Sequence, residues 1–352
     1  MSQKASVVIL GNENVDDNAL WIKACEEKKV NYQLVNLTEN DSLEKIASMK
    51  FDYLLAKPSC RTAKFKRIYD ERISILNRTL GNRIYPSPQE IFIYENKIVL
   101  SKWLSENKIP HPNTNVFFNK SEAITFCKQS NYPIVAKLSI GASGRGVQIL
   151  KTQTEASNYI DSVFSGKGVR QSVGPNLEKG NILKRVINNV LNPIGVIKKI
   201  KKYSDIYGDK QTDFVLFQEF IPHDFEWRVV RIGNSFFAHK KIVKNKKASG
   251  SLIKGYENPP LELFNFVKRI TDEHQMFSQA VDIFEQGSNY LVNEMQCIFG
   301  QSDSYQMLVN GKKGRYIYSN DNWVFEEGDF NKNECYNLRL DWVLQQISLY
   351  KK

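Results

Sequence analysis

The first part of the chain alternates short apolar runs with stretches of helical periodicity. The apolar runs are expected to form strands at residues 7–10, 33–37 and 53–56. The stretches between them are expected to form helices around residues 20–28 and 43–49. Strands that alternate with helices are typical of a parallel sheet covered by helices. We therefore predict a small α/β domain over residues 1–84, followed by a turn at Pro86 and Pro88.

Beyond residue 84 the pattern favours antiparallel hairpins. Three are expected, with strand pairs at 134–138 and 147–150, at 227–232 and 235–243, and at 280–284 and 290–296. The second hairpin turns at Gly233 and Asn234, which are suited to a two-residue loop. Helices are expected at 97–107, 154–163 and 263–277.

Composition excludes several classes of protein. The chain has 352 residues, of which 41% are hydrophobic and 25% charged, as expected of a globular protein with two or three domains. Neither a signal peptide nor a run of 18 apolar residues is found, so we expect a cytoplasmic protein without a transmembrane helix. The five cysteines are scattered and form no CxxC pair, which indicates neither a disulfide framework nor a zinc site.

Positive charge is the unusual bulk property. The chain has 49 Lys and Arg residues against 38 Asp and Glu residues, which gives a net charge of +11. Ten basic residues against three acidic ones fall in 166–210, and six lysines without one acidic residue fall in 240–254. The excess is therefore local and indicates an anionic substrate or an anionic surface as partner. Nucleic acid is not expected, because the basic segments have few aromatic residues to stack on bases.

Residues 180–204 combine helically spaced apolar residues with lysines. This combination is typical of a helix that makes a peripheral contact with anionic lipid, and also of a helix that packs its apolar stripe on the protein. Both interpretations are open at this point.

The third hairpin brings two carboxylates together. If its turn is centred on Ser288, Asp282 lies directly across from Glu294, and Gln296 shares their face by strand alternation. Opposed carboxylates repel each other unless a cation lies between them. Two carboxylates and an amide oxygen suit Mg²⁺ or Mn²⁺ better than zinc. The alternative is a solvated polar face.

The second hairpin pairs Arg228 with His239 and Glu226 with Lys241 on one face. Glu226 and Lys241 form either an ordinary cross-strand ion pair or part of a ligand site.

The first hairpin has a glycine-rich tip, GASGRG, at residues 141–146. It follows neither the Walker A nor the Rossmann pattern. Glycines would allow backbone N–H groups to approach phosphate oxygens, with Ser143 and Arg145 as further donors and Lys137 beside them. The alternative is a simple turn that follows an edge-strand lysine.

Taken in order, these features resemble the ATP-grasp superfamily, in particular the branch of the ribosomal-protein glutamate ligase and glutathione synthetase. The resemblance covers residues 85–300, and it places the small α/β domain before the grasp. It implies a two-lobed ATP-grasp region over 85–305, with a lid subdomain at about 112–217 that includes a basic insertion at 166–210. Residues 306–352 are then expected to be a C-terminal extension packed on the grasp core.

The resemblance also assigns nucleotide-binding roles. Two lysines match the family's phosphate-binding lysines, the GASGRG loop matches the flexible loop over the triphosphate, and residues 218–221 match the hinge that reads adenine. A glutamate follows where a carboxylate commonly holds the ribose. The residues expected to bind ATP are Lys97, Lys137, Ser143, Gly144, Arg145, Gly146, Gln218, Glu219, Phe220, Ile221 and Glu226.

Catalytic and metal-binding roles follow in the same way. Arg228 matches the arginine that steadies the γ-phosphate or an acyl phosphate, and Lys240 or Lys241 lies near a basic position that contacts substrate. The magnesium ligands match Asp282, Glu294 and Gln296.

The chain departs from the family at two places beside these ligands. Gln296 replaces the usual asparagine, and residues 297–300 replace a proline–glycine turn that commonly helps to form the substrate pocket. Glutamine keeps a carbonyl oxygen, so metal binding is still expected.

The resemblance implies a carboxylate–amine ligase that depends on ATP and Mg²⁺ (or Mn²⁺). Such an enzyme phosphorylates a small-molecule acid and lets an amine attack the acyl phosphate. Two alternatives are open: an ATP-grasp kinase that stops at phosphorylation, and a nucleotide-regulated protein that binds a polyanion or a membrane surface.

Overall fold

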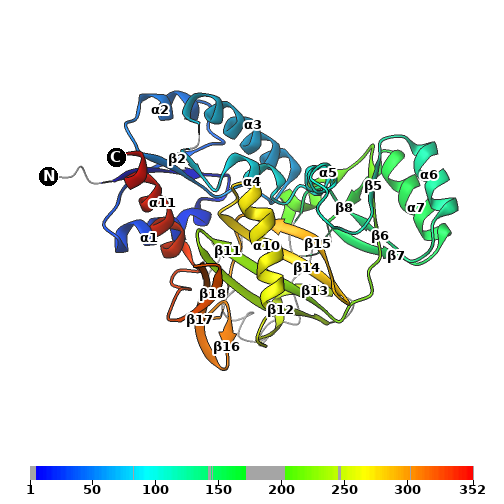
Figure 1. Cartoon of the computed structure of the whole chain (residues 1–352). Helices are drawn as coiled ribbons and strands as arrows, with labels where there is room; N and C mark the ends of the chain where they lie inside the picture. The colour runs from blue at the N-terminus through cyan, green and yellow to red at the C-terminus, as the bar shows by residue number, and fades with distance from the viewer. Residues whose placement is uncertain are drawn as a thin grey trace, which may run out of the picture. The chain divides into compact units, whose positions relative to one another are not determined.

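The structure is a computed structural model that describes residues 5–81, 83–141, 144, 146–171, 203–244, 247–301 and 303–351. The chain divides into two compact units, whose elements are labelled in Figure 1. Unit 1 comprises Met1–Ser59, Phe65–His111 and His223–Lys352, and unit 2 comprises Cys60–Lys64 and Pro112–Pro222.

Unit 1 begins with a parallel sheet in the strand order β2-β1-β3-β4. The strands are β1 (Ser6–Gly11), β2 (Asn31–Asn36), β3 (Tyr53–Ala56) and β4 (Ile84–Tyr85). The helical elements between them are η1 (Val15–Asn18), α1 (Ala19–Glu27), α2 (Ser42–Ser48) and α3 (Ala63–Leu80). All residues of β3 are buried, as expected of a parallel strand covered on both faces. The predicted parallel sheet with covering helices is confirmed, whereas α3 was not predicted.

The second sheet of unit 1 has eight strands and runs β15-β14-β11-β12-β17-β16, with β13 paired to β12 and β18 paired to β17. Its strands are β11 (Phe225–Ile232), β12 (Ser235–Lys244), β13 (Lys247–Gly255), β14 (Ser278–Gln286), β15 (Asn289–Gln296), β16 (Leu308–Val309), β17 (Lys312–Ser319) and β18 (Asn322–Glu327). The second and third predicted hairpins are therefore confirmed as β11–β12 and β14–β15.

Four helices of unit 1 accompany this sheet: α4 (Pro88–Ile93), α5 (Lys97–Glu106), α10 (Leu261–Glu273) and α11 (Tyr336–Tyr350). Figure 1 shows α10 lying across the sheet, and its apolar residues Leu263, Phe264 and Val267 are buried in the core with strand residues. Helix α11 packs on α1, where the rings of Trp21 and Tyr336 meet edge to face at 4.8 Å.

The tip of the β11–β12 hairpin lies under α11. Gly233 has a φ of +56°, which favours glycine, and a Cβ atom there would come within 2.5 Å of the Trp342 ring. Both the turn and this contact therefore require glycine.

Unit 2 contains an antiparallel sheet in the order β5-β10-β6-β7. The described elements of unit 2 are β5 (Thr114–Phe117), α6 (Lys120–Gln129), β6 (Ile134–Lys137), β7 (Val147–Leu150), α7 (Gln153–Phe164), β8 (Val169–Arg170), β9 (Lys210–Gln211) and β10 (Val215–Glu219), of which β8 and β9 pair with each other. The predicted hairpin around the glycine-rich segment is confirmed as β6–β7, in which Lys137 pairs with Val147.

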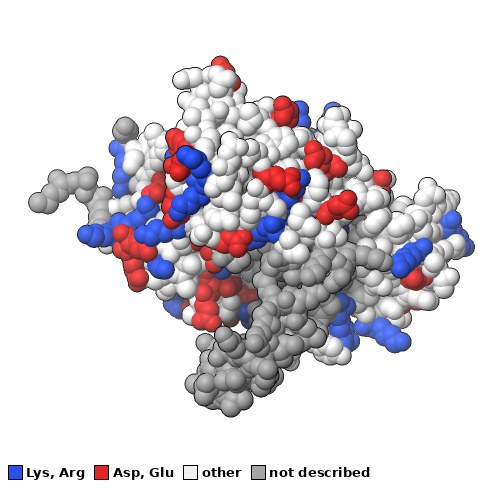
Figure 2. All heavy atoms as spheres, turned by 90° about the horizontal axis from the view of Figure 1, so that it is seen from below, with Lys and Arg blue, Asp and Glu red and all other residues white. Residues whose placement is uncertain are grey.

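Charged residues of both signs are interspersed on the surface. Figure 2 shows acidic and basic side chains in small mixed groups over the described part of the face that it presents. Residues 172–202, which hold most of the basic insertion and nearly all of segment 180–204, lie outside the described residues. Within the described ranges, no helix combines the length and the apolar character that a membrane span requires.

The predicted domain boundaries at residues 84 and 305 stay predictions. Unit 1 gathers residues from all three predicted regions, and β17 of the predicted C-terminal extension pairs with β12 of the large sheet.

Candidate functional site

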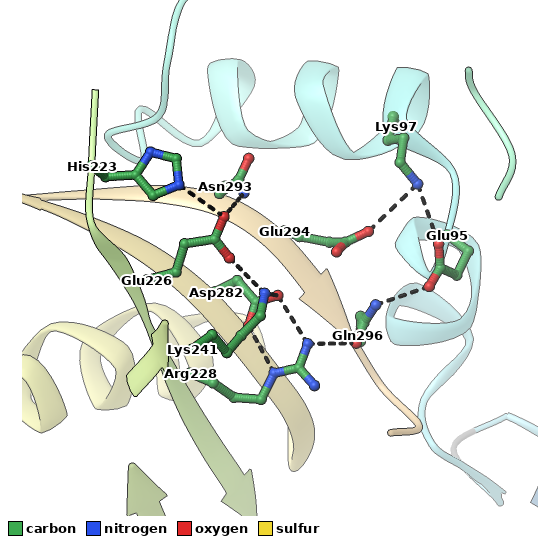
Figure 3. Close-up of polar contacts among 10 residues, drawn as sticks. All are labelled: Glu95, Lys97, His223, Glu226, Arg228, Lys241, Asp282, Asn293, Glu294 and Gln296. Carbon is green, nitrogen blue, oxygen red and sulfur yellow. Dashed lines mark hydrogen bonds and ion pairs between the residues drawn. The ribbon is translucent and has the colours of Figure 1, made fainter. Parts of the chain in front are cut away.

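Neighbouring strands of the large sheet carry a row of charged side chains on one face. Arg228 of β11 lies opposite His239 of β12 on one side and opposite Asp282 of β14 on the other. Asp282 in turn lies opposite Glu294 of β15. The cross-strand pairs predicted from the sequence are therefore confirmed, and Figure 3 shows Arg228, Asp282 and Glu294 with the side chains around them.

The pairing of Asp282 with Glu294 depends on a β-bulge. The turn consists of Gly287 and Ser288, so a regular ladder would place Asp282 opposite Asn293. The ladder instead shifts by one residue, and Asn293 becomes the extra residue of a bulge. The prediction of a turn centred on Ser288 was therefore wrong for the pairs near the tip. It was right for Asp282 and Glu294, because the bulge shifts the register before that pair. The bulge brings two successive side chains, Asn293 and Glu294, to the site.

Asp282 is held by two cations of the chain itself. Arg228 donates from Nε and Nη2 to its two carboxylate oxygens at 2.8 and 2.9 Å, and Lys241 Nζ contacts Oδ2 at 2.7 Å. Burial alone would raise the pKa of the fully buried Asp282, but the charges of Arg228 and Lys241 outweigh it and hold that pKa well below its usual range. These three groups therefore stay ionised.

Lys241 and Lys240 point to opposite faces of β12. Lys241 is buried beside Asp282, whereas Lys240 lies over the Phe225 ring, 4.1 Å from its centroid, and contacts Glu257. Strand alternation thus selects Lys241 as the lysine that reaches the site.

Glu226 is the second carboxylate that holds Lys241. Its Oε2 accepts a hydrogen bond from Lys241 at 2.5 Å, and its Oε1 accepts one from Asn293 at 3.0 Å. His223 Nε2 lies 3.7 Å from the same carboxylate. The residue predicted to hold ribose is therefore engaged with side chains of its own unit.

Lys97 enters the site from the start of α5. Its Nζ lies 3.2 Å from Glu95 Oε2 and 3.4 Å from Glu294 Oε1. Burial opposes the charge of Lys97, but the two glutamates raise its pKa above the usual value.

Glu95 was not predicted as a site residue. It is buried, its φ is +51°, and its Oε1 accepts a hydrogen bond from Gln296 Nε2 at 2.9 Å. Burial and the charge of the nearby Glu294 outweigh the opposing charge of Lys97 and raise the pKa of Glu95 to about 7. The only local signal for this residue was its position two residues before Lys97.

His239 lies at the far end of the charged row. Its Nδ1 lies 2.9 Å from the Gln306 carbonyl oxygen. Burial, followed by the charge of Arg228, lowers the pKa of His239 to about 3, so the ring is neutral near pH 7.

The three predicted metal ligands are not equally open to a divalent cation. Both oxygens of Asp282 are used by Arg228 and Lys241, and Gln296 Oε1 accepts a hydrogen bond from Arg228 Nη2 at 3.0 Å. Glu294, whose side chain is 24% exposed, is the most open of the three. The donor chemistry thus fits Mg²⁺ best at Glu294, and the other two would have to release their cationic partners first.

The remaining predicted ATP contacts belong to unit 2. Lys137 is buried at the end of β6, and Gly144 and Gly146 lie in the hairpin loop, whereas Ser143 and Arg145 lie outside the described residues. Gln218 and Glu219 end β10, where Gln218 Nε2 donates to Thr114 Oγ1 at 3.2 Å and Glu219 Oε2 accepts from the Asn113 backbone N–H at 3.3 Å. Phe220 and Ile221 follow directly.

Solved structures with the same architecture include an ATP-grasp RimK domain protein of Sphaerobacter thermophilus, with a TM-score of 0.51, 18% identity and coverage of 83% of this chain and 90% of that one. The D-alanine–D-alanine ligase of Bacillus anthracis matches with a TM-score of 0.52 and 14% identity over 98% of both chains. The N5-carboxyaminoimidazole ribonucleotide synthetase of Thermus thermophilus matches with a TM-score of 0.56 and 12% identity over 96% of this chain and 78% of that one. This chain has the ATP-grasp fold.

A similarity in sequence points in the same direction. The glutamate–LysW ligase ArgX of Sulfurisphaera tokodaii is 23% identical over 181 residues, which are 51% of this chain and 60% of the relative. The aligned part thus spans about 60% of the length of that curated relative. No family model matches the sequence. The predicted ATP-grasp fold is confirmed by these comparisons.

Proposed function

We propose that this ATP-grasp protein is an ATP-dependent carboxylate–amine ligase. The observation that carries the proposal is the row of charged residues Arg228, Asp282 and Glu294, flanked by Lys241 and Lys97. Three cations and several carboxylates converge on one face of the large sheet. Such a cluster can bind a triphosphate and a divalent cation and can stabilise the charge that develops during phosphoryl transfer.

The proposed reaction has two steps. The oxygen of a substrate carboxylate attacks the γ-phosphorus of ATP, the bond to the β,γ-bridging oxygen breaks, and ADP leaves. An amine then attacks the carbonyl carbon of the acyl phosphate, an amide forms, and inorganic phosphate leaves. Neither step needs a nucleophile from the protein, which agrees with a site made of cations, carboxylates and amides.

Six residues of the site have proposed roles in binding the phosphates, the acid and the metal ion. Arg228 and Lys97 contact the γ-phosphate and the oxygens of the acyl phosphate, and Lys241 contacts the acid substrate. Glu294, with Asp282 and Gln296 as the other candidates, binds Mg²⁺ or Mn²⁺. The metal ion, when bound, supplies positive charge at the phosphate oxygens.

Residues of unit 2 have proposed roles of their own in the binding of ATP. Lys137 and the loop residues Ser143, Gly144, Arg145 and Gly146 would contact phosphate oxygens through their amino, hydroxyl, guanidinium and backbone N–H groups. The backbone of Gln218, Glu219, Phe220 and Ile221 would read adenine.

At least one substrate of the proposed reaction is anionic. The excess of positive charge falls in 166–210 and 240–254, whereas the remainder of the chain is close to neutral. The curated relative is named a glutamate–LysW ligase, and glutamate is an acid that would meet such basic segments.

The experiment that tests the proposal uses hydroxylamine as a general amine. The full-length protein is incubated with ATP, Mg²⁺ and individual amino acids or small dicarboxylic acids, and both ADP and hydroxamate are measured. Hydroxamate that depends on ATP and on the acid shows that an acyl phosphate forms, because hydroxylamine captures it. Replacing hydroxylamine by individual amino acids as amines then separates the two enzymes, because a ligase releases an amide together with inorganic phosphate and ADP. ADP and a phosphorylated product without an amide from any of these amines would indicate a kinase instead.

A matched pair of variants ties the activity to the site. Lys241→Met removes the buried lysine and, assayed at a temperature at which circular dichroism shows the variant folded, should abolish hydroxamate formation. Lys240→Met removes the neighbouring lysine on the opposite face and should leave it unchanged.

A further inference from the structure

Gln296 bridges two charged residues of the site. Its Oε1 accepts a hydrogen bond from Arg228 Nη2 at 3.0 Å, and its Nε2 donates one to Glu95 Oε1 at 2.9 Å. Glu95 Oε2 in turn lies 3.2 Å from Lys97 Nζ. A continuous chain of polar contacts therefore joins Lys97 to Arg228, as Figure 3 shows.

The orientation of the Gln296 amide follows from the chemistry of its partners. A guanidinium group has N–H donors and no acceptor, so the side of the amide that faces Arg228 must be its oxygen. The nitrogen is then left to donate to the carboxylate of Glu95. The carbonyl oxygen of Gln296 is therefore committed to Arg228.

Glu95 is placed for this contact by an unusual backbone. Its φ of +51° lies in the left-handed region, which residues other than glycine seldom adopt, and its side chain is buried. Strain of this kind persists where the surrounding structure fixes the residue, and it often marks a functional position. In this conformation Glu95 contacts both Lys97 and Gln296.

We propose that Glu95 and Gln296 are positioning residues that fix Lys97 and Arg228 relative to each other, and that Gln296 does not ligate the divalent cation. Glu294 is then the protein ligand on β15, together with phosphate oxygens. The part of the inference that concerns the metal rests on the proposed function. Gln296, whose side chain is one methylene longer than that of asparagine, reaches both Arg228 and Glu95 from this strand.

Two substitutions of Gln296 distinguish a residue that bridges Arg228 and Glu95 from one that ligates the metal ion. Asparagine keeps the amide oxygen that a metal would need but is too short to span both partners, whereas alanine removes both functions. If Gln296 is a bridge, Gln296→Asn and Gln296→Ala behave alike. If it is a ligand, the asparagine variant retains metal affinity and the alanine variant loses it.

The measurement is Mn²⁺ affinity by electron paramagnetic resonance, on the full-length protein with a non-hydrolysable ATP analogue. We expect both Gln296 variants to keep the wild-type dissociation constant within about twofold, and Glu294→Ala to raise it by about tenfold or more. A rise for Gln296→Ala as large as that for Glu294→Ala, with Gln296→Asn close to wild type, would overturn the inference.

A second measurement tests the bridge without any ligand. Thermal unfolding is compared for wild type, Glu95→Ala, Gln296→Ala and the double variant. Residues joined by a hydrogen bond should be coupled, so the double variant should lose less in Tm than the sum of the two single losses. Additive losses would overturn the bridge.

The two measurements also separate this inference from the proposed function. A wild-type protein that binds no Mn²⁺ with the ATP analogue would contradict the proposed function and the metal part of the inference. The hydrogen bond between Glu95 and Gln296 would still be tested independently by the double-mutant cycle.

Discussion

Asp282 faces Glu294 across β14 and β15 because a bulge at Asn293 shifts the register between them. Without the extra residue, Glu294 would point to the opposite face of the sheet, since a shift of one residue reverses every side chain of a strand. The bulge therefore decides which β15 side chains belong to the site.

Replacement of Lys241 by methionine should destabilise the fold strongly. The change leaves Asp282 and Glu226 buried without their shared cation, and the loss of one partner of a buried ion pair costs roughly 3–5 kcal/mol. Lys240→Met is the matched control and should cost less than about 1 kcal/mol, because Glu257 is largely exposed. Urea unfolding of both variants checks the prediction, and equal losses would contradict it.

Stability should depend on pH through Glu90. Burial raises the pKa of Glu90 from 4.5 to about 7, and hydrogen bonds from the Ser87 and Ser278 backbone N–H groups lower it only in part. Between these pH values the folded protein keeps a proton that the unfolded chain has lost. The free energy of unfolding should therefore fall as the pH rises through this window, by up to ~3 kcal/mol, and then stay level.

Glu90→Gln removes this dependence. The free energy of unfolding of the variant minus that of wild type should increase as the pH rises from about 5 to about 7.5. The exposed Glu44→Gln is the control, for which the difference from wild type should stay constant. A Glu90→Gln difference that does not change with pH would show that this carboxyl does not titrate in the window.

Alanine substitutions at two glycines distinguish the stability cost of backbone strain from that of steric overlap. Gly287→Ala should cost about 1–2 kcal/mol, because Gly287 has a φ of +60° but open space around it. Gly233→Ala should cost roughly 1–3 kcal/mol more, because its new methyl group also overlaps the Trp342 ring. Thermal or urea unfolding measures both, and similar losses would mean that Trp342 moves aside without cost.

Lys97→Met should weaken the binding of the ATP triphosphate. Removal of a cation from the phosphate chain should raise the dissociation constant for ATP by about tenfold, or ~1.4 kcal/mol, and leave that for adenosine unchanged. Lys102→Met, at an exposed position of the same helix, is the control. Calorimetric titration provides the measurement, and an equal loss for ATP and adenosine would place Lys97 away from the phosphates.

Much of the fold follows from local patterns. The β11–β12 hairpin was predicted with its register, because a glycine–asparagine turn and alternating apolar residues specify a hairpin locally. The parallel sheet of unit 1 was predicted from the alternation of strands and helices. Helix α3 was missed although it spans 18 residues and its buried residues Tyr69, Ile73 and Leu76 follow helical spacing.

The candidate site was predictable only in part. Asp282 and Glu294 were found from the hairpin, and the bulge that brings them together was not, because no rule of sequence alternation specifies an inserted residue. Glu95 carried no pattern of its own. Its partner Gln296 lies 201 residues further along the chain, and its role became visible only from their hydrogen bond.

The sequence by itself determined which residues face each other across the β11–β12 hairpin, because turn chemistry and strand alternation act between residues close in the chain. The tertiary structure decided the partner of each charge. Asp282 contacts Arg228 and Lys241, and Gln296 contacts Arg228 and Glu95. These contacts form because segments far apart in the chain pack together, and each buried polar group must find its hydrogen-bond partner among the groups that this packing brings near.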